Sequence, residues 1–259
     1  MKQPAKPFLK WAGGKTQLAN EIEKLFPEKL LQSEFTYIEP FVGSGAMLFR
    51  MLQQFPRMRR AVVNDINPDL INTWRVIASR PAELLGVLQE LQTAYHALED
   101  LPEQKKDYYY QQRELFNSRA SESSTQAALF IFLNRTCFNG LYRVNRANRF
   151  NVPAGRYRQP TICNTANIIA VSQALQKVEI LCGDYQATRL LADDKTLFYL
   201  DPPYKPVSST ASFTSYAREG FGDAEQVQLR DFCQQLSQSG YYWVLSNSDA
   251  KGEHARNRF

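Results

Sequence analysis

The sequence holds little of the material that builds metal sites, disulfide frameworks and membrane spans. Its 259 residues include two histidines and four cysteines, and no pair of cysteines has C-x-x-C spacing. Zinc ligation, a disulfide framework and a histidine-based catalytic triad are therefore disfavoured. No apolar run approaches the ~18 residues of a membrane span, and the N-terminus lacks a signal-type apolar core. We expect a cytoplasmic protein with reduced thiols and without a metal or a membrane anchor.

The composition that remains is that of a globular protein with a basic surplus. The chain is 44% hydrophobic and 22% charged, with a net charge of +5, which suits one large domain or a domain with a sizeable insertion. A surplus of this sign is compatible with a polyanionic partner. The positive charge gathers in one segment, which contains Arg135, Arg143, Arg146, Arg149, Arg156 and Arg158.

A glycine-rich turn between a strand and a helix predicts a nucleotide-like ligand. Residues 35–39 have strand character, residues 40–45 form the turn and residues 46–54 form an amphipathic helix. A second strand, residues 61–65, ends at Asp65 about 22 residues beyond Gly43, where an acid can hydrogen-bond a ribose diol. The turn lacks the G-x-G-x-x-G pattern, so NAD is disfavoured and S-adenosylmethionine fits better. A plain βαβ unit would give the same pattern.

The stretch Phe198-Tyr-Leu-Asp-Pro-Pro-Tyr204 predicts a small polar mouth at the end of a strand. The prolines end the strand because they fix φ and remove backbone donors. The Asp201 carboxylate, the carbonyls before the prolines and the Tyr204 ring could then receive a planar amino group. The alternative is an ordinary Pro-Pro turn. Another acid and ring, Asp184-Tyr185, follow the strand at residues 178–182 and suit the N6 group and face of an adenine.

The middle of the chain differs in character. Helices are expected over residues 69–79, 82–95, 104–116 and 126–133. Residues 138–160 then interleave arginine and asparagine with aromatic residues, around a hairpin turning near Ala147-Asn148. Arginine can read guanine, asparagine can read adenine, and aromatic rings can enter an opened duplex. A solvated basic hairpin is the alternative, but the pattern favours nucleic acid.

Five motifs, in order, resemble the Dam-type DNA adenine-N6 methyltransferases, which act on GATC. They are F-x-x-x-x-G-G-K at residues 8–15, E-P-F-V-G-S-G at 39–45, N-G-L-Y-R at 139–143, F-N-V-P with G-R-Y at 150–157, and D-P-P-Y at 201–204. The resemblance covers residues 7–248 and implies an α/β fold, a doubly wound Rossmann-like methyltransferase sheet. It also implies an inserted, mostly helical recognition domain carrying the hairpin, at residues 68–159, between residues 1–67 and 160–259 of the catalytic domain.

The resemblance also implies roles for individual residues. S-adenosylmethionine would bind to Trp11, Lys15, Phe41, Asp65, Asp184, Tyr185 and Asp201, with Asp65 at the ribose and Asp184-Tyr185 at the adenine. The catalytic set would be Asp201, Pro202 and Tyr204. Double-stranded DNA would be read by Lys10, Phe138, Asn139, Leu141, Arg143, Pro153, Arg156 and Tyr157, with Phe138 as a wedge and Arg143 as a guanine reader.

The expected function is methyl transfer to adenine N6 in duplex DNA, by a protein that works as a monomer at the nucleoid. In the family a helix and a final β-hairpin follow the strand that ends in Ser-Asn-Ser, whereas residues 249–259 end this chain. The C-terminal strands of the family are therefore expected to be missing, and an inactive GATC-binding remnant is one alternative. An amino methyltransferase acting on cytosine N4 is another.

Overall fold

The computed structural model describes residues 3–11, 18–203 and 221–247. Two predicted site residues, Lys15 and Tyr204, lie outside the described residues, as does the tail at 249–259.

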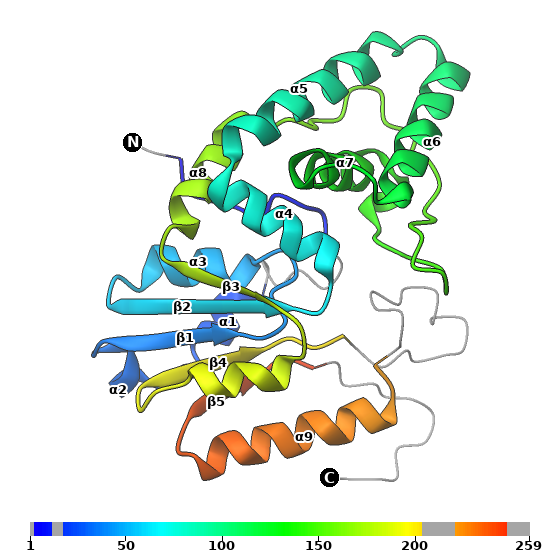
Figure 1. The fold of residues 1–259 in the computed structure, drawn as a ribbon. Helices are drawn as coiled ribbons and strands as arrows, with labels where there is room; N and C mark the ends of the chain where they lie inside the picture. The colour runs from blue at the N-terminus through cyan, green and yellow to red at the C-terminus, as the bar shows by residue number, and fades with distance from the viewer. Residues whose placement is uncertain (1–2, 12–17, 204–220, 248–259) are drawn as a thin grey trace.

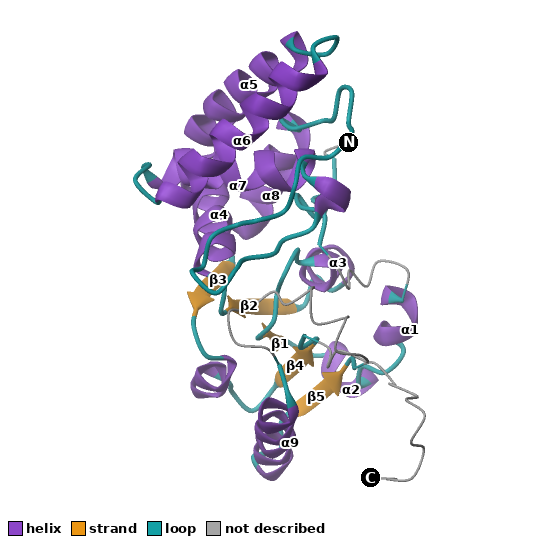
Figure 2. Ribbon diagram, turned by 90° about the vertical axis from the view of Figure 1, so that its right-hand side faces the viewer, coloured by secondary structure: helices purple, strands orange, loops and turns teal. Residues whose placement is uncertain are grey.

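The described chain is built on one parallel five-stranded sheet (Figure 1). Its strands are β1 (Phe35–Glu39), β2 (Met58–Asp65), β3 (Val178–Cys182), β4 (Thr196–Leu200) and β5 (Tyr242–Leu245), in the order β3-β2-β1-β4-β5. Figure 2 shows them stacked in this order. The order runs in one direction from β1 through β2 to β3 and reverses from β1 to β4. The β1–β4 boundary is therefore the topological switch point, where open α/β sheets bind ligands.

Both faces of the sheet are covered, which explains why every residue of β1 and β4 is buried. Tyr37 and Leu197 belong to one buried cluster, while their neighbours Ile38 and Phe198 belong to a second cluster on the other face. The first cluster includes side chains of α3 (Ala46–Gln54), and the second includes those of α9 (Asp223–Gln238). In Figure 2, α3 and α9 lie on opposite sides of the strands. The prediction of an α/β parallel sheet is confirmed.

Five helices stand between β2 and β3 and gather above the sheet in Figure 1. They are α4 (Pro68–Ser79), α5 (Pro81–Ala97), α6 (Pro102–Ser118), α7 (Ser123–Thr136) and α8 (Thr165–Leu175). The short helices α1 (Ala19–Glu23) and α2 (Glu28–Leu31) precede β1. A 3-10 turn η1 (Phe138–Gly140) follows α7, and another, η2 (Tyr185–Leu191), follows β3. No described helix has the length and apolar character needed to cross a membrane.

The start of α4 shows how the sequence sets an element boundary. Asn67 has extended backbone and its side-chain oxygen accepts hydrogen bonds from the N–H groups of Asp69 and Leu70, while Pro68 occupies the first helical position. Both features are typical of helix N-termini. Helix α4 contacts β2 and β3 on the sheet as well as α7 and α8. The boundary of an inserted domain at residue 68 therefore stays a prediction.

The predicted hairpin is a tight turn rather than a pair of extended strands. An isolated antiparallel bridge joins Val144 to Phe150, and another joins Cys137 to Ala154. Between the first pair, the Asn145 side chain accepts hydrogen bonds from the N–H groups of Ala147 and Arg149. Asparagine side chains compete with ladder hydrogen bonds in this way. The turn therefore lies where it was expected, but the segments on its two sides pair through the single Val144–Phe150 bridge instead of a continuous ladder.

Candidate functional site

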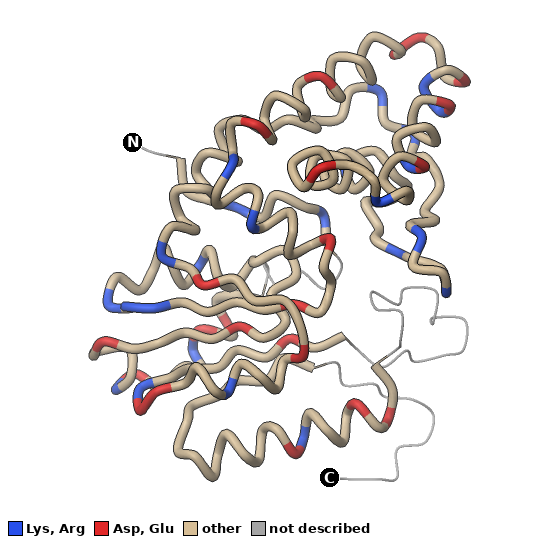
Figure 3. Tube along the Cα trace, viewed as in Figure 1, with Lys and Arg blue, Asp and Glu red and all other residues tan. Residues whose placement is uncertain are grey.

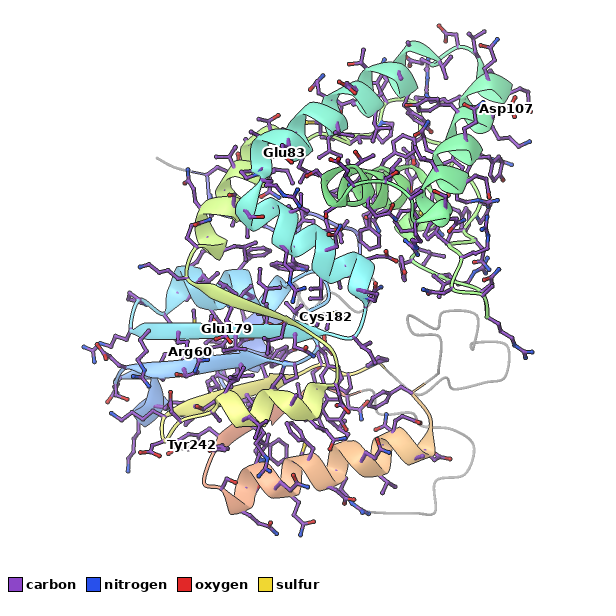
Figure 4. The ribbon with its side chains drawn as sticks, viewed as in Figure 1. Arg60, Glu83, Asp107, Glu179, Cys182 and Tyr242 are labelled. Atoms are coloured by element: carbon purple, nitrogen blue, oxygen red, sulfur yellow. The ribbon has the colours of Figure 1, made fainter. Side chains whose placement is uncertain are left out.

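The carboxyl ends of the parallel strands bring the predicted cofactor and catalytic segments to one edge of the sheet. Figure 4 marks this edge at Cys182, the last residue of β3. The glycine-rich turn follows β1, Asp65 ends β2, Asp184 lies just beyond β3, and Asp201 directly follows β4. Segments up to 160 residues apart in sequence therefore meet at the switch point described above.

The glycine-rich turn is held in a conformation that side chains rarely allow. Gly43 has φ +48° and Gly45 has φ +74°, values at which glycine carries no steric penalty. The Gly43 carbonyl accepts a hydrogen bond from Trp74 Nε1 at 3.1 Å. A Cβ atom on Gly43 would stand 2.9 Å from the Trp11 indole. Trp11, predicted for the cofactor pocket, therefore lies directly against the turn.

Asp65 completes this turn from the neighbouring strand. Its Oδ2 accepts a hydrogen bond from Gly43 N at 3.1 Å, and its Oδ1 accepts one from Asn67 N at 2.9 Å. Burial raises the pKa of Asp65 from 3.8 to about 6, and these backbone hydrogen bonds oppose that rise. An ionised carboxylate has about four acceptor positions. Three of them accept backbone hydrogen bonds, from Gly43, Ile66 and Asn67, so about one remains for a hydroxyl group of a ligand.

Aromatic residues line the site beyond β1 and β3. The rings of Phe41 and Tyr185 lie 4.9 Å apart, and Phe221 and Phe232 meet them edge-on. The Tyr185 hydroxyl is buried and has no hydrogen-bond partner among the described residues. Its burial raises its pKa to about 12, so it stays a donor at neutral pH. A buried donor without a partner is costly, and a polar ligand group would relieve that cost.

Asp184 has a structural task as well as its predicted one. It is exposed, and its Oδ1 accepts a hydrogen bond from Gln186 N at 2.8 Å, which caps η2. This cap was not foreseen, because a seven-residue 3-10 segment has no periodic apolar signal. Asp184 and Tyr185 nonetheless lie side by side at the end of β3, as predicted.

At the end of β4, Pro202 is buried and Asp201 is partly buried. A second carboxyl lies near them on β1, since the charge of Asp201 acts on Glu39. Glu39 is 2% exposed and accepts a hydrogen bond from the Tyr37 hydroxyl at 2.8 Å. Burial, followed by the charge of Asp201, holds the pKa of Glu39 well above its usual range. Sequence reasoning missed this role for Glu39, although an acid before Pro40 at a strand end was a usable signal.

The predicted DNA-reading residues form a second group, at the C-terminal end of α7. Lys10 Nζ lies 3.2 Å from the Tyr157 hydroxyl and 4.3 Å from the centre of its ring. Phe138 and Asn139 are exposed in η1, and the Phe138 N–H donates to the Pro153 carbonyl at 2.9 Å. Phe138 is 51% exposed, so its ring is accessible to a partner.

The remaining predicted readers lie on the turn segment. Arg143 is partly buried, and its guanidinium donates from Nε to Asn151 Oδ1 at 2.7 Å and from Nη2 to the Asn151 carbonyl at 3.4 Å. Leu141 is partly buried, whereas Pro153 and Arg156 are exposed. Figure 3 shows basic residues along this segment and acidic residues around the strand ends. The two groups therefore carry opposite charge.

A stacked pair of rings joins the two groups. The indole of Trp11 stacks on the Tyr142 ring, with centroids 5.7 Å apart and planes 24° apart. The Tyr142 hydroxyl donates to Asp69 Oδ2 at 3.3 Å, and Arg119 pairs with Asp69 Oδ1 at 2.6 Å. Sequence reasoning missed Asp69 and Arg119, because nothing local pairs residues 50 positions apart.

Comparison with known proteins shows the family of the chain. The sequence model of the family described as D12 class N6 adenine-specific DNA methyltransferase matches residues 11–258. The type II methyltransferase M.MjaIII of Methanocaldococcus jannaschii is 43% identical over 246 residues, covering 94% of this chain and 84% of the relative. The DNA adenine methylases of Haemophilus influenzae and Escherichia coli K12 are 36% and 34% identical, covering 95% and 93% of this chain and 80% of each relative. The chain belongs to the D12 class of N6 adenine-specific DNA methyltransferases.

Proposed function

We propose that this protein transfers a methyl group from S-adenosylmethionine to the N6 atom of adenine in duplex DNA, with GATC as its target. The observation that carries the proposal is the meeting of Asp201-Pro202 with the Gly43–Asp65 turn at the β1–β4 switch point. Relatives named DNA adenine methylase support the choice of base.

The residues at the strand ends fit the proposed cofactor. Asp65 would accept a hydrogen bond from a ribose hydroxyl, since its three backbone hydrogen bonds leave about one acceptor position. Phe41 and Tyr185 offer an aromatic wall and a buried hydroxyl without a partner in the described chain, beside the exposed carboxylate of Asp184. Trp11 would form the wall of the cofactor pocket next to Gly43, and Lys15 is proposed to line the same pocket. When bound, S-adenosylmethionine supplies a methyl group on a positively charged sulfur.

Asp201 and Pro202 would prepare the base. An exocyclic amino nitrogen is a poor nucleophile because its lone pair is delocalised into the ring. The Asp201 carboxylate and the Pro202 carbonyl would accept the two N6 hydrogens, which localises the lone pair and fixes the direction of attack. Burial raises the pKa of the neighbouring Glu39 carboxyl well above its usual range, and the charge of Asp201 raises it further. Tyr204 is proposed to stack on the flipped base, whose extrusion costs a few kcal/mol.

The second group would bind the duplex. We propose that residues 68–159 form the recognition domain, in which Phe138 enters the base stack and Arg143 reads a guanine. Asn151 orients the Arg143 guanidinium through two hydrogen bonds, and a fixed fork is what bidentate recognition of guanine requires. Lys10, Asn139, Leu141, Pro153, Arg156 and Tyr157 complete the proposed contact surface.

Labelled S-adenosylmethionine and two duplexes, one with GATC and one scrambled, test the proposal. Wild-type protein should label the GATC duplex alone, and Asp201→Ala should abolish labelling. Asp194→Ala is the matched control, because Asp194 is exposed and lies just before the amino end of β4, at the opposite edge of the sheet from the proposed site. It should keep wild-type activity. Digestion of the product to nucleosides separates N6-methyladenine from N4-methylcytosine. Binding of the GATC duplex without labelling would instead identify an inactive remnant.

A further inference from the structure

One buried amide links the two groups described above. Asn134 lies in the last turn of α7 and is 3% exposed. Its Oδ1 accepts a hydrogen bond from Lys10 N at 2.8 Å, and its Nδ2 donates to Lys10 O at 2.7 Å and to Gly140 O at 3.0 Å. Both N–H donors of the amide are thus used. Because the amide is buried, water cannot readily replace these bonds.

The side chain of Lys10 continues from this anchor toward the proposed DNA surface. Gly140 has φ +64°, and a Cβ atom there would stand 2.4 Å from Lys10 Cδ. The lysine stem therefore lies against the backbone of the turn that carries Phe138 and Asn139. Beyond the stem, the Lys10 ammonium meets Tyr157. The lysine is fixed at its main chain by Asn134 and at its tip by Tyr157.

We propose that Asn134 is a positioning residue for DNA recognition. Its carboxamide ties the Lys10 main chain to the Phe138–Gly140 turn, so that the Lys10 ammonium and the turn meet the duplex as one unit. The inference rests on the proposed function, because it assumes that this surface binds DNA. If the role of Asn134 were purely structural, replacing it would affect the KM for DNA no more than replacing another asparagine that anchors the same segment.

Asn167 in α8 is a matched control. It is 4% exposed, its Oδ1 accepts from Lys6 N at 3.0 Å and its Nδ2 donates to Lys6 O at 3.0 Å. It therefore anchors the same N-terminal segment by the same pair of bonds, four residues before Lys10. Replacing either asparagine by aspartate keeps the shape but turns an N–H donor into an oxygen facing a carbonyl oxygen.

The experiment measures unfolding, kcat and KM for Asn134→Asp, Asn167→Asp, Lys10→Ala and the double variant Lys10→Ala/Asn134→Asp. Both aspartate variants should lose free energy of unfolding, and Asn134→Asp should lose more, because it gives up two N–H donor bonds and Asn167→Asp gives up one. Of the two aspartate variants, only Asn134→Asp should raise the KM for duplex DNA. The expected rise is about tenfold, which corresponds to one lost DNA contact. Its KM for S-adenosylmethionine should change by less than about twofold. In the Lys10→Ala background the substitution should add less than about twofold, because contacting residues are not additive.

Gly140→Ala provides an independent route should Asn134→Asp fail to fold. It pushes the lysine stem away without changing the Asn134 side chain, and it should also raise the KM for DNA selectively. A KM for DNA in Asn134→Asp equal to that of Asn167→Asp would overturn the inference. An equal rise in both KM values would also overturn it. Wild-type protein that binds duplex DNA without transfer would contradict the proposed function alone, and Kd for DNA would then replace KM in the same comparisons. Wild-type protein that does not bind DNA would contradict both.

Discussion

The glycine-rich turn makes the sharpest stability prediction, because one added methyl group meets two separate obstacles at Gly45. The backbone there has φ +74°, and a Cβ atom would stand 2.4 Å from Trp74 Cη2 and 2.8 Å from Trp74 Cζ2. A residue other than glycine in this conformation costs roughly 1–2 kcal/mol, and overpacking a core costs roughly 1–3 kcal/mol more. Gly45→Ala should therefore lose about 2–5 kcal/mol of unfolding free energy.

Trp74 cannot move aside to accept the methyl group. It is fully buried, and its ring lies 5.0 Å from Phe8 and 5.5 Å from Phe49. Its Nε1 also holds the Gly43 carbonyl, so any shift of the indole disturbs the turn that faces the cofactor site. The variant should consequently lose cofactor affinity as well as stability.

Urea denaturation of Gly45→Ala beside Gly86→Ala checks this reasoning. Gly86 is exposed within α5, and a Cβ atom there would contact nothing within 4 Å. The same substitution should therefore stabilise the protein by roughly 0.5–1 kcal/mol, through helix propensity. Opposite signs at the two positions are the expected result. A Gly45→Ala variant within about 0.5 kcal/mol of wild type would refute the packing argument, since surface changes have effects of that size.

Three further predictions concern ionisation, specificity and burial. Folding raises the pKa of Asp65 from 3.8 to about 6, so the contribution of Asp65 to stability is full below pH 3.8 and is lost as the pH rises through 6. Asp65→Asn should therefore flatten this part of the curve of unfolding free energy against pH. A curve unchanged by the substitution would contradict the prediction. Arg143→Ala should relax discrimination at one guanine by ~1–3 kcal/mol, measured as kcat/KM on GATC and single-mismatch duplexes, and unchanged discrimination would refute its role. Tyr109→Phe removes a buried hydroxyl that donates to the Val152 carbonyl at 2.8 Å and should cost roughly 1–3 kcal/mol; a loss no greater than that of Tyr110→Phe would contradict it.

Local patterns were sufficient to predict the elements whose signals lie within a few residues. The helix at 46–54 and the strands at 35–39 and 178–182 have the predicted bounds, because glycines, prolines and chain polarity mark their ends. The acids at the strand ends also follow from local pattern once the sheet is parallel. Strand β2 begins three residues before its predicted start, at Met58, because the flanking Arg59 and Arg60 are polar yet pair with Asp193 and Glu179 at 2.6 Å. Figure 4 shows Arg60 and Glu179 on adjacent strands.

Side chains that pair across long sequence distances could not be predicted in this way. Asn134 reads as one polar residue in an apolar helix, and its partner Lys10 lies 124 residues away. Arg119 directly follows α6, and its guanidinium reaches Asp69 and lies 4.2 Å from the centre of the Phe116 ring. Such contacts depend on the path of the whole chain, which composition and periodicity do not encode.

The anchoring of the N-terminal segment also sets the order in which the protein can be completed during its synthesis. The segment is made first, but its partners Asn134 and Asn167 are made much later, the second of them 161 residues after Lys6. At 5–20 residues per second, roughly 10–30 s pass between the two ends of that contact. Phe8 and Leu9, both buried in the finished protein, belong to a segment that lacks both asparagine anchors during this interval. A ribosome-bound nascent chain that stops before α8 should therefore expose these two side chains to chaperones, and a chain extended past α8 should not.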